Sequence, residues 1–153
     1  MIIRSLSADD VAAVQQLAAE AEAEGFGFVT RFLTDLANHR VSLVGPGEFF
    51  LGAVEQNRLV ALGGVTPDPY VDDPTTGRLR HLYVSPDVRR RGFGRALVRT
   101  LEARAWPTYR RLRLRTDTTL AARFYAQLGY ESSSEAHATH ERRWLPRVEC
   151  PEV

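Results

Sequence analysis

The chain contains no lysine and a single cysteine. All 20 of its basic residues are arginines, and 19 acidic residues leave a formal net charge of +1. The absence of lysine excludes catalysis through a lysine nucleophile or Schiff base. The lone thiol, Cys150, cannot form an internal disulfide and has no partner at metal-site spacing, which favours a reducing compartment. Balanced charge provides no overall field that would attract nucleic acid or an anionic membrane.

Long apolar runs are also missing. No stretch is long enough to span a bilayer, and the segment "MIIRSLSADDVAAV" lacks the apolar core and cleavage site of a signal peptide. We therefore predict a cytoplasmic protein without a membrane partner. No internal repeat, low-complexity tract or linker divides the 153 residues, so we predict one domain over residues 1–153.

Hydrophobic periodicity predicts a series of strands and helices. Residues 2–6 are expected to form a strand, followed by a helix that Ser7 caps and a shorter helix over about residues 29–37. "EFFLGAVE" and "RLVALGGVTP" have the pattern of two strands joined by a turn at Gln56-Asn57. The predicted elements that follow are a strand at 78–84, a helix at 93–104, the strand "RRLRLRT", a helix ending at Gly129 and a strand around "ATHERRWL".

The order of these elements indicates the fold class. Only one strand–helix–strand unit is evident, between Leu79 and Thr116, and such a unit joins parallel strands. We therefore predict an α+β protein whose mixed, mostly antiparallel twisted sheet is flanked by helices. In "RRLRLRT" the arginines alternate with other residues, which predicts that they line one exposed face of the sheet.

The segment "VSPDVRRRGFGRALV" joins a predicted strand to a predicted helix. The start of a helix leaves backbone N–H groups unpaired and attracts anions. Gly92 and Gly94 would let a ligand approach the backbone, and Arg89–Arg91 offer fork-shaped donors to phosphate oxygens. Leu97 stands where a G-x-G-x-x-G loop has its third glycine. The segment predicts a site for a phosphate-bearing cofactor; the alternative is a glycine-containing turn with solvated arginines.

This segment resembles the acetyl-CoA-binding segment of the GNAT acyltransferase superfamily, whose hallmark is Arg/Gln-x-x-Gly-x-Gly/Ala. "TTLAARFYAQLGY" is similar to the second signature of that family, an Asn-x-x-Ala-x-x-x-Tyr helix with a Leu-Gly-aromatic ending. Thr118 stands where the family usually has asparagine, which helps to position the pantetheine arm. The resemblance covers nearly the whole chain and implies a GNAT-type fold in which the parallel unit forms the CoA site. The matching residues are Ala121, Tyr125, Leu128, Gly129 and Tyr130.

The resemblance implies an acyltransferase that uses acetyl-CoA and no metal. It implies that the strand before the loop pairs through its backbone with the pantetheine arm, as an added strand would. It also implies that N–H groups of the loop hold the pyrophosphate. The implied cofactor contacts are Leu82, Tyr83, Val84, Arg89, Arg90, Arg91, Gly92, Phe93, Gly94, Arg95, Thr118 and Phe124.

The implied general acid is Tyr125, because the matching tyrosine in related enzymes protonates the departing thiolate. The alternatives are that Tyr125 only positions the sulfur or only packs within the helix. An amine acceptor also needs a base, since about one part in a thousand of it is neutral at pH 7. The identity of the base stays open among His81, Glu48, Glu55 and His140.

The acceptor site is expected where the first two helices meet the loop after the third strand. Acidic side chains there would suit a cationic amine, whereas aromatic ones would wall an apolar pocket. The sequence does not decide between these two chemistries. The acidic candidates are Glu20, Glu22, Glu24, Asp68, Asp72 and Asp73, and the aromatic ones are Phe26, Phe28, Phe32 and Tyr70.

The predicted function is an acetyl-CoA-dependent N-acetyltransferase that acts on the primary amine of a small molecule or peptide by direct attack. No covalent intermediate is expected, since Cys150 has no neighbouring histidine. The alternative is a non-catalytic acyl-CoA-binding or sensing module. A nucleic-acid binder using Arg111, Arg113 and Arg115 is disfavoured by the net charge. The acceptor, the acyl chain length and the formation of a homodimer stay open.

Overall fold

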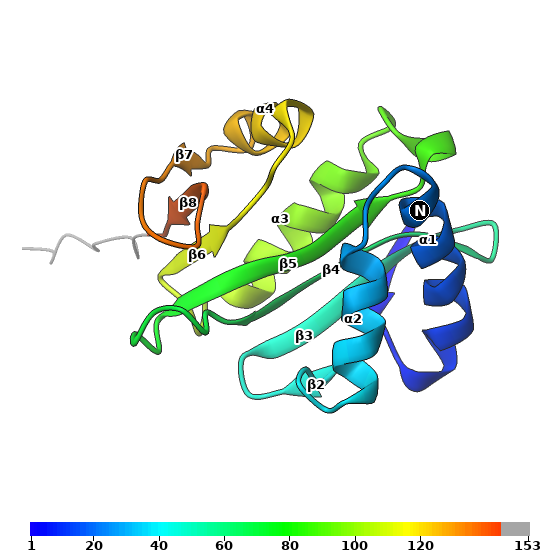
Figure 1. The fold of residues 1–153 in the computed structure, drawn as a ribbon, viewed down its shortest axis with the longest axis horizontal. Coiled ribbons are helices and arrows are strands. Elements are labelled where there is room, and N and C mark those ends of the chain that lie inside the picture. The colour runs from blue at the N-terminus through cyan, green and yellow to red at the C-terminus, as the bar shows by residue number, and fades with distance from the viewer. Residues whose placement is uncertain (145–153) are drawn as a thin grey trace, which may run out of the picture.

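The computed structural model describes residues 1–144 (Figure 1). Cys150 lies outside these described residues, so the inference drawn from its thiol is not addressed by the structure. In chain order the elements are β1 (Ile2–Ser5), α1 (Val11–Ala23), α2 (Phe28–Ala37), β2 (Val44–Gly45), β3 (Glu48–Glu55), β4 (Arg58–Pro67), β5 (Thr76–Val84), α3 (Phe93–Ala105), β6 (Arg111–Leu114), α4 (Thr119–Gln127), β7 (Glu131–Ser132) and β8 (His140–Arg143), with 3-10 turns at Ala8–Asp10 and Pro86–Val88.

The strands form one sheet in the order β1-β3-β4-β5-β6-β8-β7, with β2 beside β3. The pair β5–β6 is parallel and is connected through α3, whereas the other pairs are antiparallel. Helices α1 and α2 cover one face of the sheet and α3 covers the other (Figure 1), with one apolar cluster on each side. The predicted α+β class with a mixed, mostly antiparallel sheet is confirmed.

Several local features follow directly from the sequence. At the β3–β4 hairpin, Gln56 and Asn57 have φ angles of 49° and 60°, the conformation that a two-residue primed turn requires. Gly129 ends the α4 segment with a φ of 94°. Before α1, the Asp10 carboxylate accepts a hydrogen bond from the Ser7 N–H at 2.8 Å. The short strands β2 and β7 are additions to the predicted pattern.

Strands β5 and β6 pair only near their beginnings. Their register runs from Thr76 beside Arg111 to Arg78 beside Arg113. Beyond this point β5 continues to Val84, while the chain leaves β6 and turns toward α4 (Figure 1). We call this divergence the strand fork. It leaves one edge of the second half of β5 without a neighbouring strand, as an added-strand mode of binding requires.

A β-bulge in β5 coincides with the strand fork. The register between β4 and β5 shifts between Leu62 and Gly64, so that His81 and Leu82 lie opposite Gly63. His81 takes a φ of 60°, a left-handed conformation that is uncommon outside glycine. The bulge therefore bends β5 where it leaves β6.

The prediction of an exposed arginine face on β6 is wrong. The side chain of Arg113 is 3% exposed and that of Arg111 is 13% exposed. The loop before β8 folds over this face, and the carbonyl of Ala136 accepts a hydrogen bond from Arg113 Nη2 at 2.6 Å. Both faces of β6 are therefore covered, although arginine and leucine alternate along it. The arginine face can be buried because distant segments supply hydrogen-bond acceptors for the guanidinium groups.

None of the helices in the described part of the chain combines the length and apolar character that crossing a bilayer requires. Residues 1–144 also hold no group of three or more His, Cys, Asp or Glu side chains arranged to bind a metal ion.

Candidate cofactor and active site

The segment between β5 and α3 forms an open loop at residues 89–92, which we call the cofactor loop. Gly92 precedes α3 with a φ of 84°, and a Cβ built there would have no atom within 4 Å. Arg90 also has a positive φ, of 65°. Only glycine adopts such angles without strain. The cofactor loop therefore exposes its backbone next to the unpaired N–H groups at the start of α3, where an anion binds favourably.

Gly94 brings the two sequence motifs into contact. A Cβ at this position would lie 3.3 Å from Cζ of Phe124 and 3.5 Å from a methyl group of Val84. Helix α4 thus packs through Phe124 on the first turn of α3, beside the end of β5. In the direction of a Cβ, the space at Gly94 is bordered by side chains of the protein, and the prediction that Gly94 contacts the cofactor concerns its backbone N–H. Its function in the structure is the close approach of α3 and α4.

Two of the three consecutive arginines contact protein acceptors. Arg89 donates from Nη2 to Glu24 Oε1 at 2.8 Å and from Nε to the Val84 carbonyl at 3.0 Å. Arg91 forms a two-pronged ion pair with Glu55. Within residues 1–144, no carboxylate pairs with the exposed side chains of Arg90 and Arg95. These two side chains are the ones left to reach a phosphate from this segment.

The other implied cofactor contacts can act mainly through their backbones. Phe93 is 4% exposed and belongs to the core beneath α3, against which Leu82 also packs. The ring of Tyr83 is buried on the opposite face, and its hydroxyl donates to Glu24 at 3.0 Å. Thr118 is the N-cap of α4, where its hydroxyl accepts from the Ala121 N–H at 3.1 Å.

Tyr125 lies on α4 among aromatic neighbours. Its ring centroid is 5.1 Å from that of Phe124, 5.5 Å from that of Tyr130 and 6.4 Å from that of His140. The Tyr130 hydroxyl in turn donates to the buried Glu102 at 2.9 Å. Burial raises the pKa of Tyr125 above its ordinary value of 10.0. The phenol therefore keeps its proton at neutral pH.

Of the candidate bases, His81 has the environment of a structural histidine. Its Nδ1 lies 3.0 Å from the Phe28 carbonyl, so this nitrogen carries the proton and donates it. The imidazole lies beside the stacked pair of Phe32 and Phe50, with ring centroids 5.2 and 6.3 Å away. Burial lowers the pKa of His81 to about 4. Its Nε2 is buried and has no hydrogen-bond partner among the described residues.

The remaining candidate bases differ in their surroundings. Glu55 is paired with Arg91, whose hydrogen bonds lower the pKa of its carboxyl group. Glu48 accepts a hydrogen bond from the Ser42 N–H at 3.1 Å. His140 is the candidate that lies near Tyr125, and its Nδ1 is 2.9 Å from Thr139 Oγ1. The structure therefore brings one of the four candidates, His140, next to the implied acid.

The acidic acceptor candidates on α1 are engaged with the protein. Glu20 accepts a hydrogen bond from Ser85, and Glu22 accepts one from Thr30 at 2.7 Å. Glu24 accepts from Arg89, as described above. These contacts neutralise or occupy the carboxylates that were expected to face a cationic amine.

The remaining acceptor candidates lie in different environments. Phe32 is 1% exposed, whereas Tyr70 is 55% exposed and stacks on His137, with 4.1 Å between centroids. Asp73 accepts hydrogen bonds from Thr75 and Thr76 in its own loop. Phe26 and Phe28 lie with ring centroids 5.9 Å apart and pack with Phe32 in the apolar cluster under α1 and α2, so Tyr70 is the aromatic candidate that lies apart.

A buried ionic cluster at the strand fork was missed by the sequence reasoning. The Asp68 side chain is fully buried, with its Oδ2 3.3 Å from Arg78 Nη1 and 3.4 Å from Arg113 Nε. Arg78 also donates to the carbonyl of His137 at 2.7 Å. The cluster joins the loop after β4 to the loop before β8. No local pattern indicates it, because its members are far apart in the chain.

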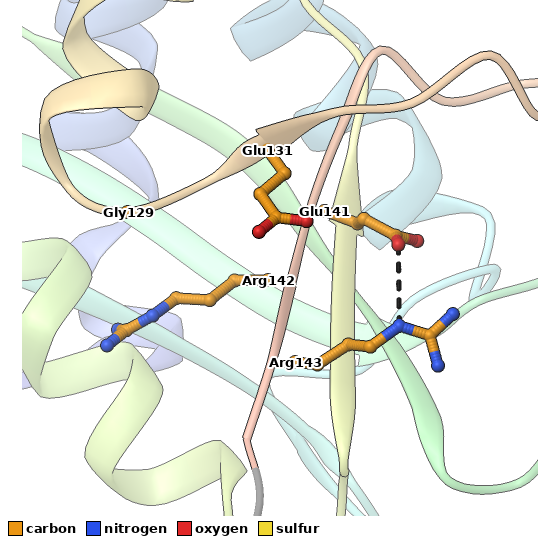
Figure 2. Close-up of a pocket in the computed structure, with 5 residues that line it drawn as sticks. All are labelled: Gly129, Glu131, Glu141, Arg142 and Arg143. Carbon is orange, nitrogen blue, oxygen red and sulfur yellow. Dashed lines mark hydrogen bonds and ion pairs between the residues drawn. The ribbon is translucent and has the colours of Figure 1, made fainter.

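A small polar hollow lies at the β7–β8 edge, away from the cofactor loop (Figure 2). On one side of it Arg143 Nε donates to Glu141 at 3.4 Å, whereas Arg142 extends the other way and meets Glu102 at 2.6 Å. None of the predicted site residues lines this hollow, and three of its four charged side chains, Glu141, Arg142 and Arg143, form ion pairs. The strand fork and the cofactor loop are therefore the candidate site.

Comparison with known proteins identifies the family and agrees with the fold. The sequence profile of the Acetyltransferase (GNAT) family matches residues 12–130. The chain therefore belongs to the GNAT family of acetyltransferases, and the resemblance seen in its two motifs is confirmed. A comparison with curated proteins finds no significant match.

Solved structures share the whole fold. A protein from Exiguobacterium sp. 255-15, provisionally assigned as an acetyltransferase, is 30% identical, with 93% of this chain and 92% of that chain covered and a TM-score of 0.82. The PaiA N-acetyltransferase of Thermoplasma acidophilum, in complex with coenzyme A, is 17% identical, with coverages of 94% and 98% and a TM-score of 0.71. A GNAT acetyltransferase of Brucella melitensis, in complex with acetyl-CoA, is 17% identical, with coverages of 95% and 88% and a TM-score of 0.71.

Proposed function

We propose that the protein transfers an acetyl group from acetyl-CoA to the primary amine of a small molecule or peptide, by direct attack and with Tyr125 as general acid. The observation that carries this proposal is the strand fork, which ends in a glycine-containing loop at the start of α3 and has the Tyr125 helix packed beside it. An extended ligand with a phosphate-bearing end fits such an edge and loop.

The residues present fit acetyl-CoA. The unpaired edge of β5, at Leu82 to Val84, would accept the pantetheine arm through its backbone. The N–H groups around Gly92 and Gly94 would hold the pyrophosphate, with Arg90 and Arg95 available for further phosphate oxygens. When bound, acetyl-CoA supplies an activated acyl group and a thiolate leaving group.

Tyr125 contributes a proton donor at the leaving sulfur. Because burial raises its pKa, Tyr125 stays protonated across the neutral range and can direct its O–H at the developing thiolate. A thiol has an ordinary pKa of about 8.5, so a hydrogen bond that strengthens as negative charge develops lowers the barrier without a metal. Phe124, packed at Gly94, holds the helix that presents this tyrosine.

The acceptor amine must lose a proton as it attacks. His81 does not suit this task in the described conformation, since its free nitrogen is buried and its proton-bearing nitrogen donates to Phe28. His140 lies near Tyr125, with 6.4 Å between ring centroids. We assign no base. The alternative function, a non-catalytic acyl-CoA-binding or sensing module, would use the same loop and strand edge without turnover.

The test is thiol release from acetyl-CoA by the purified protein, measured with a panel of amines, amino acids, polyamines and peptides. Amine-dependent release is expected. Tyr125→Phe is expected to lower kcat by about 10²–10⁴-fold, the usual contribution of a positioned general acid, while acetyl-CoA affinity stays nearly unchanged. Wild-type kcat is expected to show no loss from Tyr125 ionisation below pH 10, because its pKa is raised from 10.0.

A matched control is Tyr109→Phe, which removes a buried hydroxyl that donates to the Gly47 carbonyl away from the site. It should leave kcat unchanged. Equal kcat for Tyr125→Phe and wild type would remove Tyr125 from the chemistry. Acetyl-CoA binding without thiol release for any amine of the panel would support the binding module, and absence of acetyl-CoA binding would refute both functions.

A further inference from the structure

The second half of β5 is tied to the turn between α1 and α2 by side-chain contacts. We call residues 24–28 the α1–α2 turn. His81 donates to the Phe28 carbonyl, and Tyr83 donates to Glu24. The rings of Phe28 and Tyr83 also meet edge to face, with centroids 6.1 Å apart. The strand expected to hold the pantetheine arm therefore contacts the turn where the acceptor site is expected.

Arg89 extends this connection to the cofactor loop. Its guanidinium uses two different nitrogens, Nη2 toward Glu24 and Nε toward the Val84 carbonyl, at 2.8 and 3.0 Å. It also lies over the ring of Tyr83, 5.6 Å from the centroid. Arg89, Glu24 and Tyr83 thus contact one another pairwise. These contacts favour one orientation of the guanidinium plane, with Nε and Nη2 directed at the protein and 42% of the side chain still exposed.

The neighbouring Arg90 provides the contrast. Its backbone has a φ of 65°, its side chain is exposed, and no carboxylate among residues 1–144 pairs with it. Two adjacent arginines of one motif are therefore in opposite situations. Arg90 has no carboxylate partner there and is available to an anion, whereas Arg89, although 42% exposed, already directs Nη2 and Nε at protein acceptors.

We propose that Arg89 is a positioning residue rather than a phosphate ligand, and that it couples the cofactor loop to the α1–α2 turn through Glu24. Binding of the cofactor phosphates to the loop backbone restricts the loop, and the Arg89–Glu24 contact transmits this restriction to the acceptor side. This inference rests on the proposed function, because it takes the loop as the cofactor site and the turn as a wall of the acceptor site.

The experiment combines calorimetric titration of acetyl-CoA with hydrogen exchange of the peptide that covers residues 20–28, on the full chain. In wild type, saturating acetyl-CoA is expected to slow exchange in this peptide by at least about threefold. Arg89→Gln and Glu24→Gln are expected to keep the acetyl-CoA Kd within about twofold and to lose the added protection. Arg90→Gln is expected to raise the Kd by about tenfold and to keep the protection at saturation.

Two further variants separate positioning from general loosening. Arg40→Gln removes an exposed arginine that pairs with Asp35 beyond the other end of α2, and it should behave as wild type in both measurements. The charge exchange Arg89→Glu with Glu24→Arg restores a pair of opposite charges across the same contact. It is expected to recover a large part of the ligand-linked protection that either single change removes.

The outcomes distinguish the inference from the function on which it rests. A Kd increase for Arg89→Gln equal to that of Arg90→Gln would make Arg89 a phosphate ligand and overturn the inference. Faster exchange of residues 20–28 on acetyl-CoA binding would do so too, since it means that the cofactor pulls Arg89 off Glu24. If wild type does not bind acetyl-CoA, the proposed function fails. In that case, hydrogen exchange of residues 20–28 in the ligand-free protein tests the Arg89–Glu24 contact. Exchange in this peptide must be faster in Arg89→Gln than in Arg40→Gln, and equal exchange rates in the two variants would refute the coupling.

Discussion

The two halves of strand β5 differ in what holds them. In the first half, up to Arg78, the strand pairs with β6 and its face is covered by the loop before β8. In the second half, from Leu79 to Val84, the β6 side is free and the inward side chains contact the α1–α2 turn. One strand thus has a closed half, held by backbone pairing and buried charge, and an open half, held from one side only.

This difference explains how one edge of β5 can stay unpaired, and open to a ligand, while the strand remains fixed in the sheet. An unpaired strand edge is a liability unless something else holds the strand in place. The buried ionic cluster stabilises β5 at its closed half, and Glu24, Phe28 and Arg89 hold its open half from one face. The unpaired backbone groups of the open half are then left for an extended ligand.

The largest effect is expected from disrupting the closed half. Arg113→Ala leaves the buried Asp68 with one guanidinium partner in place of two. Removing one member of a buried ion pair costs about 3–5 kcal/mol, and we expect the Tm to fall by roughly 10 °C. Thermal unfolding measures this directly.

Arg115→Ala, one residue beyond the end of β6, is the matched control. Its side chain is 59% exposed and pairs at 3.7 Å with Asp117, which is 86% exposed, so its Tm should stay close to that of wild type. Equal Tm values for the two variants would show that the buried cluster does not stabilise the closed half.

The next effect concerns His81, in the open half of β5. Its pKa is lowered from 6.5 to about 4, so below pH 6.5 the unfolded chain takes up a proton that the folded protein does not. The stability due to neutral His81 is therefore complete above pH 6.5 and decreases as the pH falls toward 4, by up to about 3 kcal/mol.

Urea unfolding of wild type and His81→Asn at about pH 7 and about pH 4.5 checks this linkage. Asparagine tolerates the left-handed backbone at this position and does not titrate. The variant should lose less stability on acidification than wild type. The same loss in both proteins would mean that His81 is accessible to protons in the folded state.

The smallest stability effect is expected at the end of the open half. Gly92→Ala places a Cβ at a φ of 84°, which costs about 1–2 kcal/mol of backbone strain. The new methyl group meets no protein atom within 4 Å, so it should also hinder a ligand that approaches the loop. We expect weaker acetyl-CoA binding in calorimetry, beyond the effect on Tm.

Gly25→Ala provides the comparison, because Gly25 has a φ of 89° and equally open surroundings in the α1–α2 turn. It should cost similar stability and leave the acetyl-CoA Kd unchanged. A loss of affinity in Gly25→Ala as large as in Gly92→Ala would place the cofactor site elsewhere.

The arginine-rich segments show which structural features can be predicted from neighbouring residues in the sequence. Three arginines beside Gly92 correctly indicated an open loop at a helix start, because glycine conformation and helix geometry are local properties. The identity of their partners was not predictable. Glu24 and Glu55 are distant in the chain, and they occupy the two arginines on either side of Arg90.

The strand "RRLRLRT" shows the opposite result. Its alternation predicted the strand itself, which the structure confirms at Arg111–Leu114, but not the burial of Arg113. Periodicity distinguishes two faces of a strand; it does not show what covers each face. Burial of this arginine depends on Asp68 and on the carbonyl of Ala136, both from other loops.

Turns, helix ends, strand periods and the single strand–helix–strand unit were therefore accessible from the residues alone, because each depends on neighbours within one turn or one strand. The same information placed Gly92 and Tyr125 in their motifs. The fork between β5 and β6, the contact of Phe124 with Gly94 and the partners of Arg89 and Arg113 required the folded chain. They bring together groups that are far apart in sequence, and burial then decides which charges must be paired.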